Sequence, residues 1–372
     1  MRTISIVLHK FDRGGSPRVA AYLARGFAER GAAVELVVFT GRGEVDGVIA
    51  PLAGPDVKLI YLSEFKGPRS FDLAAGFRAL AKHLQRTAPD VVIAAANNVA
   101  VVTAAAVRHA GLTSTRLFLK TTNPIASSRH RGLVRAVRRW SYRRAFARAA
   151  GVWTLSPSES EEMRAAFPEF SGLFRAVYNP YVTPEMFGDE PAGNAARSDA
   201  PLILAVGRLT TQKRLERLIA AFAKVSDKKA RLLILGEGEE RERLETQVRQ
   251  LGLQDRVQMP GFSDNVAEAY RTANLVVLTS DYEGLPAVLL EAMASNCPIL
   301  TTDCFPAARA IIEGADGCAI IEDTAPAVLA AQIDAQLRRP RPSTLRAIAE
   351  HYSIENGIRS HFEAMAEGSA AR

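Results

Sequence analysis

Hydrophobic residues recur along this chain in short runs, each followed by a longer stretch with helical spacing. The runs TISIVLH (3–9), VELVVFT (34–40) and LVVLTS (275–280) have the length and the β-branched residues of buried strands. Between such runs, apolar positions repeat as they do on one face of a helix, for example in LERLIAAFAKV (215–225). Buried strands that alternate with helices are typical of parallel sheets. The pattern therefore predicts an α/β, doubly wound architecture.

This scheme of strands and helices occurs twice. In the first half, strands are predicted at 3–9, 34–40, 58–62, 90–96, 116–120 and 151–156. The scheme restarts at Leu202, after a segment rich in Pro, Gly and small residues (179–201) that is typical of a linker. A chain of 372 residues is long enough for two domains. We therefore predict one domain over 1–187, a second over 188–352, and a separate terminal segment over 353–372.

The composition is that of an ordinary globular protein, with 48% hydrophobic and 23% charged residues. No run approaches the roughly 18 consecutive apolar residues that a membrane-spanning helix needs. The start of the chain, MRTISIVLHKF, has the pattern of a strand rather than of a signal peptide. Cys297, Cys304 and Cys318 lack metal-ligand spacing and are interpreted as small core residues in a reducing compartment. These features predict a cytoplasmic protein.

The loop after the strand LVVLTS carries the most informative chemistry of the sequence. Glu283, Gly284, Leu285 and Pro286 precede the helical stretch AVLLEAMA, which contains Glu291. Proline suits the first helical position because its missing N–H would have no partner there. The free N–H groups of such a helix start favour hydroxyls, carboxylates or phosphates. Two carboxylates on this short span predict a sugar-nucleotide site, and a loop charge beside a solvated helix charge is the alternative.

A second strand end supplies cations. Arg208 and Lys213 lie on the loop after the run LILAV, and crevices at the carboxyl ends of strands hold ligands in open α/β sheets. Arginine offers a fork of N–H groups and lysine a point charge, so together they can neutralise a diphosphate. Either residue alone would be a solvated loop cation. Arg214 and Arg217, further along, are interpreted as ordinary helix surface.

Three segments carry a family resemblance: VGRLTTQKR, then LGEGEERERLETQVRQLGLQDRVQMPGF, then EGLPAVLLEAMASNCPILTTDC. Together they resemble the nucleotide-binding half of a family 4 glycosyltransferase. GGSPRVAAYLARGFAERGAAVELV, near the start, more weakly resembles the family's opening motif. The resemblance implies the GT-B fold, in which two Rossmann-like domains face each other across a cleft. It also implies that a helix at 353–366 crosses back onto the first domain.

The resemblance assigns roles around a nucleoside diphosphate sugar. Arg208 and Lys213 would hold the diphosphate, Glu291 the ribose hydroxyls, and Glu283 with the backbone of 284–286 the donor hexose. Weaker candidates stand on other loops at strand ends, where simple turn or surface roles are the alternative: Gly14, Gly15, Asn123, Glu237 and Phe262. The two glycines would approach the diphosphate or the acceptor, Asn123 would face the donor sugar, Glu237 would touch donor or base, and Phe262 would lie near the base.

The family retains anomeric configuration, by front-side attack in which the leaving phosphate accepts the acceptor's proton. The resemblance therefore implies that Arg208, Lys213 and Glu283 are catalytic without a dedicated nucleophile. Fixed cations and helix N-termini can stabilise the leaving diphosphate. The chain has no Asp-x-Asp dyad of the kind that metal-dependent transferases use, so we expect no metal. UDP is favoured over GDP from family frequency, and the expected acceptor is a glycan or a lipid-linked sugar in polysaccharide or glycolipid assembly.

Other function classes stay open or are disfavoured. A GT-B sugar-nucleotide epimerase and a non-catalytic sugar-nucleotide-binding protein are alternatives. A nicotinamide-dependent oxidoreductase is disfavoured because no G-x-G-x-x-G follows the first strand.

The sequence departs from the family pattern at two places. Asn296 stands where relatives often have glycine, and we expect it to keep the left-handed turn. The segment 307–310 lacks the usual glycine and glutamate, which leaves Arg309 either on a donor group or exposed.

Charge is distributed unevenly. No Asp or Glu occurs between Asp90 and Glu159, and eight arginines fall within 129–148. A basic helix with an interleaved tryptophan favours an anionic lipid surface, with Arg131, Arg135, Arg138 and Arg139 as its basic stripe. The alternatives are a solvated helix without a partner and, less favoured because no recognisable module accompanies it, a nucleic-acid surface. We therefore expect a peripheral protein at the inner face of the plasma membrane.

Overall fold

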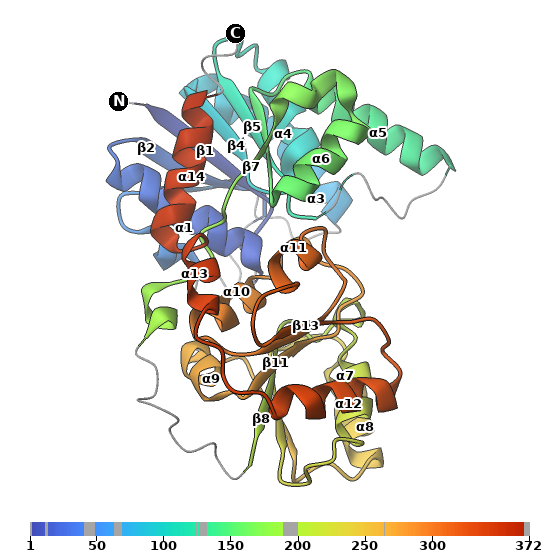
Figure 1. Cartoon of the computed structure of the whole chain (residues 1–372). Helices are drawn as coiled ribbons and strands as arrows, with labels where there is room; N and C mark the ends of the chain where they lie inside the picture. Colours follow the sequence, from blue (N-terminus) through green and yellow to red (C-terminus); the bar gives the residue numbers. More distant parts are fainter. Residues whose placement is uncertain are drawn as a thin grey trace. The chain divides into compact units, whose positions relative to one another are not determined.

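A computed structural model (Figure 1) describes residues 2–11, 14–40, 49–62, 69–123, 125, 132–188, 200–263 and 265–367, with the backbone alone for 69–75. The chain divides into two compact units. Unit 1 comprises Met1–Tyr181 and Ile354–Arg372, and unit 2 comprises Val182–Ser353. The division falls earlier than residue 187 because the following segment packs into unit 2. There the carbonyl oxygen of Met186 accepts a hydrogen bond from Ser295 Oγ at 3.1 Å.

Unit 1 is built on a parallel sheet. In the part of the chain that the structure describes, the strand order is β3-β2-β1-β4-β5-β6-β7. The strands are β1 (Thr3–Leu8), β2 (Ala33–Val38), β3 (Lys58–Tyr61), β4 (Val91–Ala94), β5 (Arg116–Lys120), β6 (Gly151–Thr154) and β7 (Phe174–Ala176). The helices are α1 (Gly15–Glu29), α3 (Arg69–Thr87), α4 (Asn97–His109), α5 (Gly132–Phe146), α6 (Pro157–Ala166) and α14 (Ile354–Glu367). Short 3-10 turns occur at η1 (Ala50–Ala53) and η2 (Pro168–Leu173).

Unit 2 repeats the design with the order β10-β9-β8-β11-β12-β13 among its described residues. The strands are β8 (Leu202–Val206), β9 (Arg231–Leu235), β10 (Val257–Gly261), β11 (Leu275–Leu278), β12 (Ile299–Thr302) and β13 (Cys318–Ile321). The helices are α7 (Leu215–Phe222), α8 (Arg241–Gln250), α9 (Val266–Thr272), α10 (Ala287–Ala294), α11 (Ala308–Ile312), α12 (Pro326–Leu337) and α13 (Leu345–Glu350), with η3 (Pro184–Phe187) and η4 (Thr211–Lys213). The strand order reverses between β8 and β11, which creates a crevice at their carboxyl ends.

The central strands, such as β1, β4 and β11, are buried because both faces of each sheet are covered. Ile203 and Leu232 of unit 2, like Val7 and Val92 of unit 1, are fully buried in hydrophobic clusters between sheet and helices. Such clusters are what near-continuous apolar runs predict for parallel sheets. The doubly wound α/β architecture expected from the sequence is confirmed in both units.

Helix α14 packs on α1 of unit 1, far from its neighbours in sequence. The contact is close because α1 carries Gly26, where an added Cβ would lie 2.3 Å from Ile358 Cδ1. At the preceding position of α14, a Cβ at Gly357 would lie 2.4 Å from the backbone nitrogen of Pro180. Two glycines thus let α14 lie against unit 1 without a gap.

A buried polar cluster lies beneath α14. Lys120, at the end of β5, donates hydrogen bonds to Asn179 Oδ1 and to His361 Nε2, the latter at 2.7 Å. His361 Nδ1 donates to the carbonyl oxygen of Gly357 at 2.7 Å, so in the neutral ring Nε2 must be the acceptor. Burial lowers the pKa of Lys120 to about 7, and the charge of Glu159 opposes this shift. Burial also lowers the pKa of His361 well below 6.5.

Helix α5 carries the arginine-rich segment. Arg129 and Arg131 lie outside the described residues, and the helix begins at Gly132. Arg138 and Arg139 of the predicted basic stripe are half-buried rather than presented to solvent. Arg139 donates to the carbonyl oxygen of the last residue of α6 at 2.6 Å, and its guanidinium lies over a buried phenyl ring. These two arginines therefore serve the packing of unit 1.

Candidate active site

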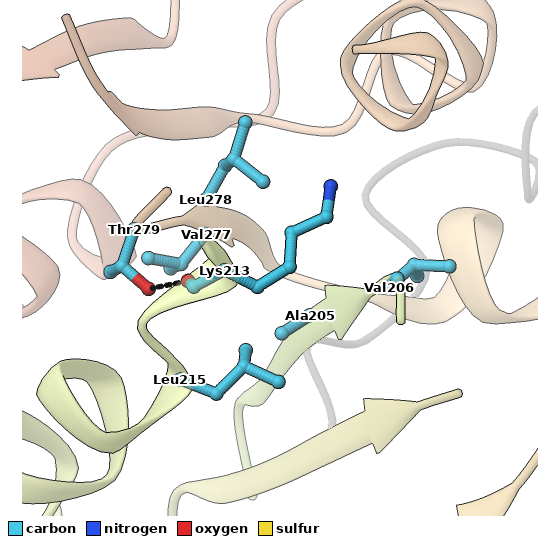
Figure 2. A pocket seen from close by; sticks show the side chains of 8 residues that line it. Ala205, Val206, Lys213, Leu215, Val277, Leu278 and Thr279 are labelled. Carbon is cyan, nitrogen blue, oxygen red and sulfur yellow. Dashed lines mark hydrogen bonds between the residues drawn. The ribbon is translucent and has the colours of Figure 1, made fainter. Parts of the chain in front are cut away.

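The loops that follow β8 and β11 are tied together. Asp281 N donates to Gln212 O at 2.9 Å, and Gln212 Nε2 donates to Tyr282 O at 2.7 Å. Thr279 Oγ1 donates to the carbonyl oxygen of Lys213 at 3.1 Å, a bond drawn in Figure 2. Because β8 and β11 are neighbours in the sheet, their loops meet at the switch point, where ligands bind in folds of this class.

Lys213 and Glu283 meet at this crevice. Lys213 Nζ lies 2.7 Å from Glu283 Oε1, and Ser280 Oγ donates to the same oxygen at 2.8 Å. Both charged side chains are mostly buried, with 16% and 12% exposure. Lys213 also lines a small pocket with residues of β8 and β11, shown in Figure 2. The sequence assigned these two residues to different parts of the ligand, whereas the structure makes them one ion pair.

The pair leaves Lys213 able to bind more. An ammonium group has three N–H donors, and the bond to Glu283 occupies one of them. Arg208, on the same loop, is exposed, and its guanidinium forms no hydrogen bond or ion pair with any residue that the structure describes. Two cations with spare donors therefore stand on one loop beside a fixed carboxylate. This is a suitable arrangement for gripping an anionic group and an adjacent hydroxyl.

Glu291 is held inside α10. The helix begins at Ala287, and Pro286 is its N-cap residue with φ −74° and ψ 109°. The expectation that Pro286 occupies the first helical position is therefore wrong by one residue, because its ψ is extended. Glu291 is buried, and Tyr270 Oη donates to its Oε2 at 2.8 Å. Tyr270 gave no signal in the sequence beyond a helical apolar position.

Asp281 is a second residue that the sequence analysis missed. Arg214 Nε lies 2.7 Å from Asp281 Oδ2, and Arg217 Nη1 lies 2.9 Å from its Oδ1. The interpretation of these two arginines as ordinary helix surface is wrong, because they hold the loop of Glu283 against α7. Burial raises the pKa of Asp281, but the hydrogen bonds and charges of the two arginines outweigh it and keep that pKa below its usual value.

The loop after β9 is packed against the loop after β8. An added Cβ at Gly236 would lie 1.9 Å from the carbonyl oxygen of Gly207, and the φ of Gly236 is +145°. Glu237 is already paired, with its Oε1 2.6 Å from Arg241 Nη2. Phe262 follows β10 with 45% of its surface exposed. Both candidates thus stand on neighbouring loops at strand ends of unit 2.

The remaining candidates divide between the units. Gly284 and Leu285 lie in unit 2 between Glu283 and α10. Gly14 is the N-cap of α1 with φ −84°, so its backbone conformation does not require glycine, and Gly15 begins the helix exposed. The side chain of Asn123 is exposed, and its carbonyl oxygen accepts a bond from the side chain of residue 97 at 2.7 Å. These last three belong to unit 1.

The divergent positions have clear structures. Asn296 adopts φ 50°, which confirms the expected left-handed turn after α10. Arg309 is exposed and forms two ion pairs: its Nη2 lies 3.0 Å from Asp303 Oδ2, and its Nη1 lies 2.6 Å from Glu313 Oε1. Among the described residues, no group of three or more His, Cys, Asp or Glu side chains gathers as metal ligands would. No described helix has the length and hydropathy of a membrane-spanning segment.

Comparison with curated proteins gives partial matches. The amylovoran biosynthesis glycosyltransferase AmsD of Erwinia amylovora is 38% identical over 102 residues, which is 27% of this chain and 29% of that protein. The alpha-D-kanosaminyltransferase of Streptomyces kanamyceticus is 30% identical over 222 residues, 55% of this chain and 53% of that protein. The chain thus spans about half or less of the length of these curated relatives.

Solved structures and family models cover more of the chain. Anabaena HepE in complex with UDP and glucose superimposes with a TM-score of 0.77 at 19% identity, over 99% of this chain and 100% of that one. A glycosyl transferase 4-like domain model matches residues 14–172, and the model for glycosyl transferases group 1 matches 187–356. The two models follow each other as the two units do. The chain therefore belongs to the family 4 glycosyltransferases and has their GT-B fold.

Proposed function

We propose that the protein transfers a hexose from a UDP-sugar to a glycan or lipid-linked acceptor in the assembly of a cell-surface polysaccharide or glycolipid. The observation that carries this proposal is the Lys213–Glu283 pair at the crevice of β8 and β11, with the guanidinium of Arg208 on the same loop. UDP is supported by the complex of HepE, and polysaccharide assembly by the part that AmsD plays in amylovoran biosynthesis.

The donor would bind in three parts. The two spare donors of Lys213 and the fork of Arg208 would hold the diphosphate. Glu291, oriented by the hydroxyl of Tyr270, would accept hydrogen bonds from the ribose. The carboxylate of Glu283, held by Lys213 and Ser280, would accept hydrogen bonds from the hexose.

Transfer then breaks the bond between the anomeric carbon and the β-phosphate oxygen and forms one to the acceptor hydroxyl oxygen. Negative charge grows on the β-phosphate oxygen, where Arg208 and Lys213 stabilise it without reorganising. In front-side attack the departing phosphate takes the acceptor's proton, so the anomeric configuration is retained. Because these residues supply the electrophilic stabilisation themselves, we propose that no metal ion is needed.

Nucleotide binding tests the donor site. UDP bound only to the folded state raises the melting temperature by mass action. We expect this shift in the wild type and its loss in Arg208→Ala, Lys213→Ala and Glu291→Ala. Arg231→Ala, which removes an exposed arginine at the start of β9, is the matched control and should keep the shift. A shift that persists in all three site variants would place the donor elsewhere.

Turnover tests the activity. The enzyme is incubated with each of a panel of UDP-hexoses and with glycan or lipid-linked acceptors. We expect it to release UDP from one of these donors and to form a linkage that keeps the donor's anomeric configuration. UDP binding without any turnover would support a non-catalytic binding protein instead.

We also propose that the enzyme works at the inner face of a membrane, where lipid-linked acceptors are presented.

A further inference from the structure

Helix α5 has two apolar faces. One face, with Tyr142 and Phe146, is buried in unit 1. The opposite face carries Leu133, Val137 and Trp140, which are 79%, 54% and 58% exposed. These three follow each other at spacings of four and three residues, so they form one continuous stripe over two turns. In Figure 1 the first turns of α5 reach away from the sheet of unit 1.

The charge on helix α5 itself is of one sign, and one of its arginines, Arg143, is paired with Glu169 of η2, with Nε 2.6 Å from Oε1. Helix α5 carries no Asp or Glu and five arginines: Arg135, Arg138, Arg139, Arg143 and Arg144. The guanidinium of Arg144 lies 4.8 Å from the centroid of the Trp140 ring, on the outward face. An arginine stacked on an exposed indole combines an apolar body with a cationic end, which suits the boundary between lipid headgroups and acyl chains.

We propose that the outward stripe of Leu133, Val137 and Trp140 inserts into the interface of an anionic lipid bilayer, with Arg144 at the level of the phosphates. This inference deepens the membrane part of the proposed function and rests on it. The sequence analysis attributed membrane binding to the basic residues of the helix, whereas this proposal attributes it mainly to apolar side chains. Arg138 and Arg139, half of the predicted basic stripe, are used within unit 1, so apolar insertion carries the binding and the exposed arginines select anionic lipid.

Two other occupants fit the face less well. A second copy of the chain would bring two arginine-rich helices together in an isologous contact, and a stripe of three side chains is far smaller than the roughly 800 Å² per partner of a stable interface. Nucleic acid would use the arginines, but Leu133 and Val137 offer no ring on which a base could stack. An anionic bilayer offers phosphates for the arginines and an apolar region in which the aliphatic side chains can be buried.

The chain contains its own reporter for insertion. It has two tryptophans, of which Trp153 is buried and only Trp140 is exposed. Vesicles of phosphatidylcholine with phosphatidylglycerol should therefore shift the emission to shorter wavelength, and the shift should disappear in Trp140→Phe. Vesicles of phosphatidylcholine alone should give a much smaller shift. Equal shifts with both vesicles would contradict the role of the arginines.

Flotation with the anionic vesicles tests the stripe. The double variant Leu133→Ser/Val137→Ser should bind at least about tenfold more weakly, because two aliphatic side chains lose their burial. Val328→Ser, which removes an exposed aliphatic residue of α12 in unit 2, is the matched control and should bind as the wild type does.

Results that would contradict the membrane proposal can be told apart. Flotation that survives the double variant would overturn the proposal in favour of a purely electrostatic contact. Absence of flotation, with a concentration-dependent increase in mass that the double variant abolishes, would assign the face to a second copy. The UDP-induced thermal shift of the same variant, measured without vesicles, separates this failure from failure of the donor site.

Discussion

The buried Lys120 predicts an unusual dependence of stability on pH. Its pKa in the folded protein is about 7, against an ordinary value of 10.5. Between these values the unfolded chain holds a proton on this lysine that the folded chain has released, so the contribution of Lys120 to the free energy of unfolding rises with pH. The slope approaches about 1.4 kcal/mol per pH unit, and the total gain is limited to roughly 4 to 5 kcal/mol. Below both pKa values the contribution no longer changes.

The perturbation is Lys120→Met, which keeps much of the side-chain length and removes the ionisable group. The variant loses the donor to Asn179 and His361, so its absolute stability falls as buried acceptors are left without a partner. That loss does not depend on pH in this window. The slope, rather than the stability itself, therefore isolates the titration of Lys120.

Urea unfolding at a series of pH values between about 7.5 and 9.5 gives the slope. A Trp140→Phe background leaves Trp153, whose ring centroid lies 5.1 Å from that of His361, as the only tryptophan and a reporter on this cluster. Burial also raises the pKa of Cys297, Cys304 and Cys318, which lowers the free energy of unfolding towards high pH in both proteins alike. We therefore expect the slope with Lys120 to exceed the slope with Met by up to about 1.4 kcal/mol per pH unit. Lys82→Met, which changes an exposed lysine of α3, should keep the slope of the protein with Lys120. Equal slopes with Lys120 and with Met would show that Lys120 does not release its proton in the folded protein in this pH range.

Three further predictions concern unit 2. Tyr270→Phe removes the hydrogen bond to Glu291, so KM for the donor should rise about tenfold in steady-state kinetics, and the melting temperature should fall because a buried carboxylate loses a donor; unchanged KM would argue against a positioning role. Gly236→Ala places a Cβ 1.9 Å from the Gly207 carbonyl oxygen at a φ that alanine rarely adopts, so thermal unfolding should show destabilisation by about 3 kcal/mol or more, and a neutral effect would contradict the packing of these loops. Exhaustive treatment with EDTA should leave turnover unchanged, whereas activity restored only by added Mg²⁺ or Mn²⁺ would disprove the metal-free proposal.

The sequence alone determined the architecture and the location of the candidate donor loops. Strands such as β8 and β11 are marked by apolar runs, and the loops that carry Arg208 and Glu283 follow them directly. These are local signals, in which the period of the pattern and the residues that end it decide the element. The left-handed turn at Asn296 was predictable for the same reason, since asparagine tolerates that backbone conformation.

Which side chains meet depends on how the elements pack in three dimensions. The pairs Lys213–Glu283 and Tyr270–Glu291 join residues on different loops and helices, and such pairings follow from strand order rather than from local pattern. The same holds for α14, which reaches Lys120 across most of the chain length through His361. For α5, composition revealed the arginines, but the burial of Tyr142 and Phe146 was needed to fix which face turns outward, because the sequence of a helix with two apolar faces does not show which of them its neighbours cover.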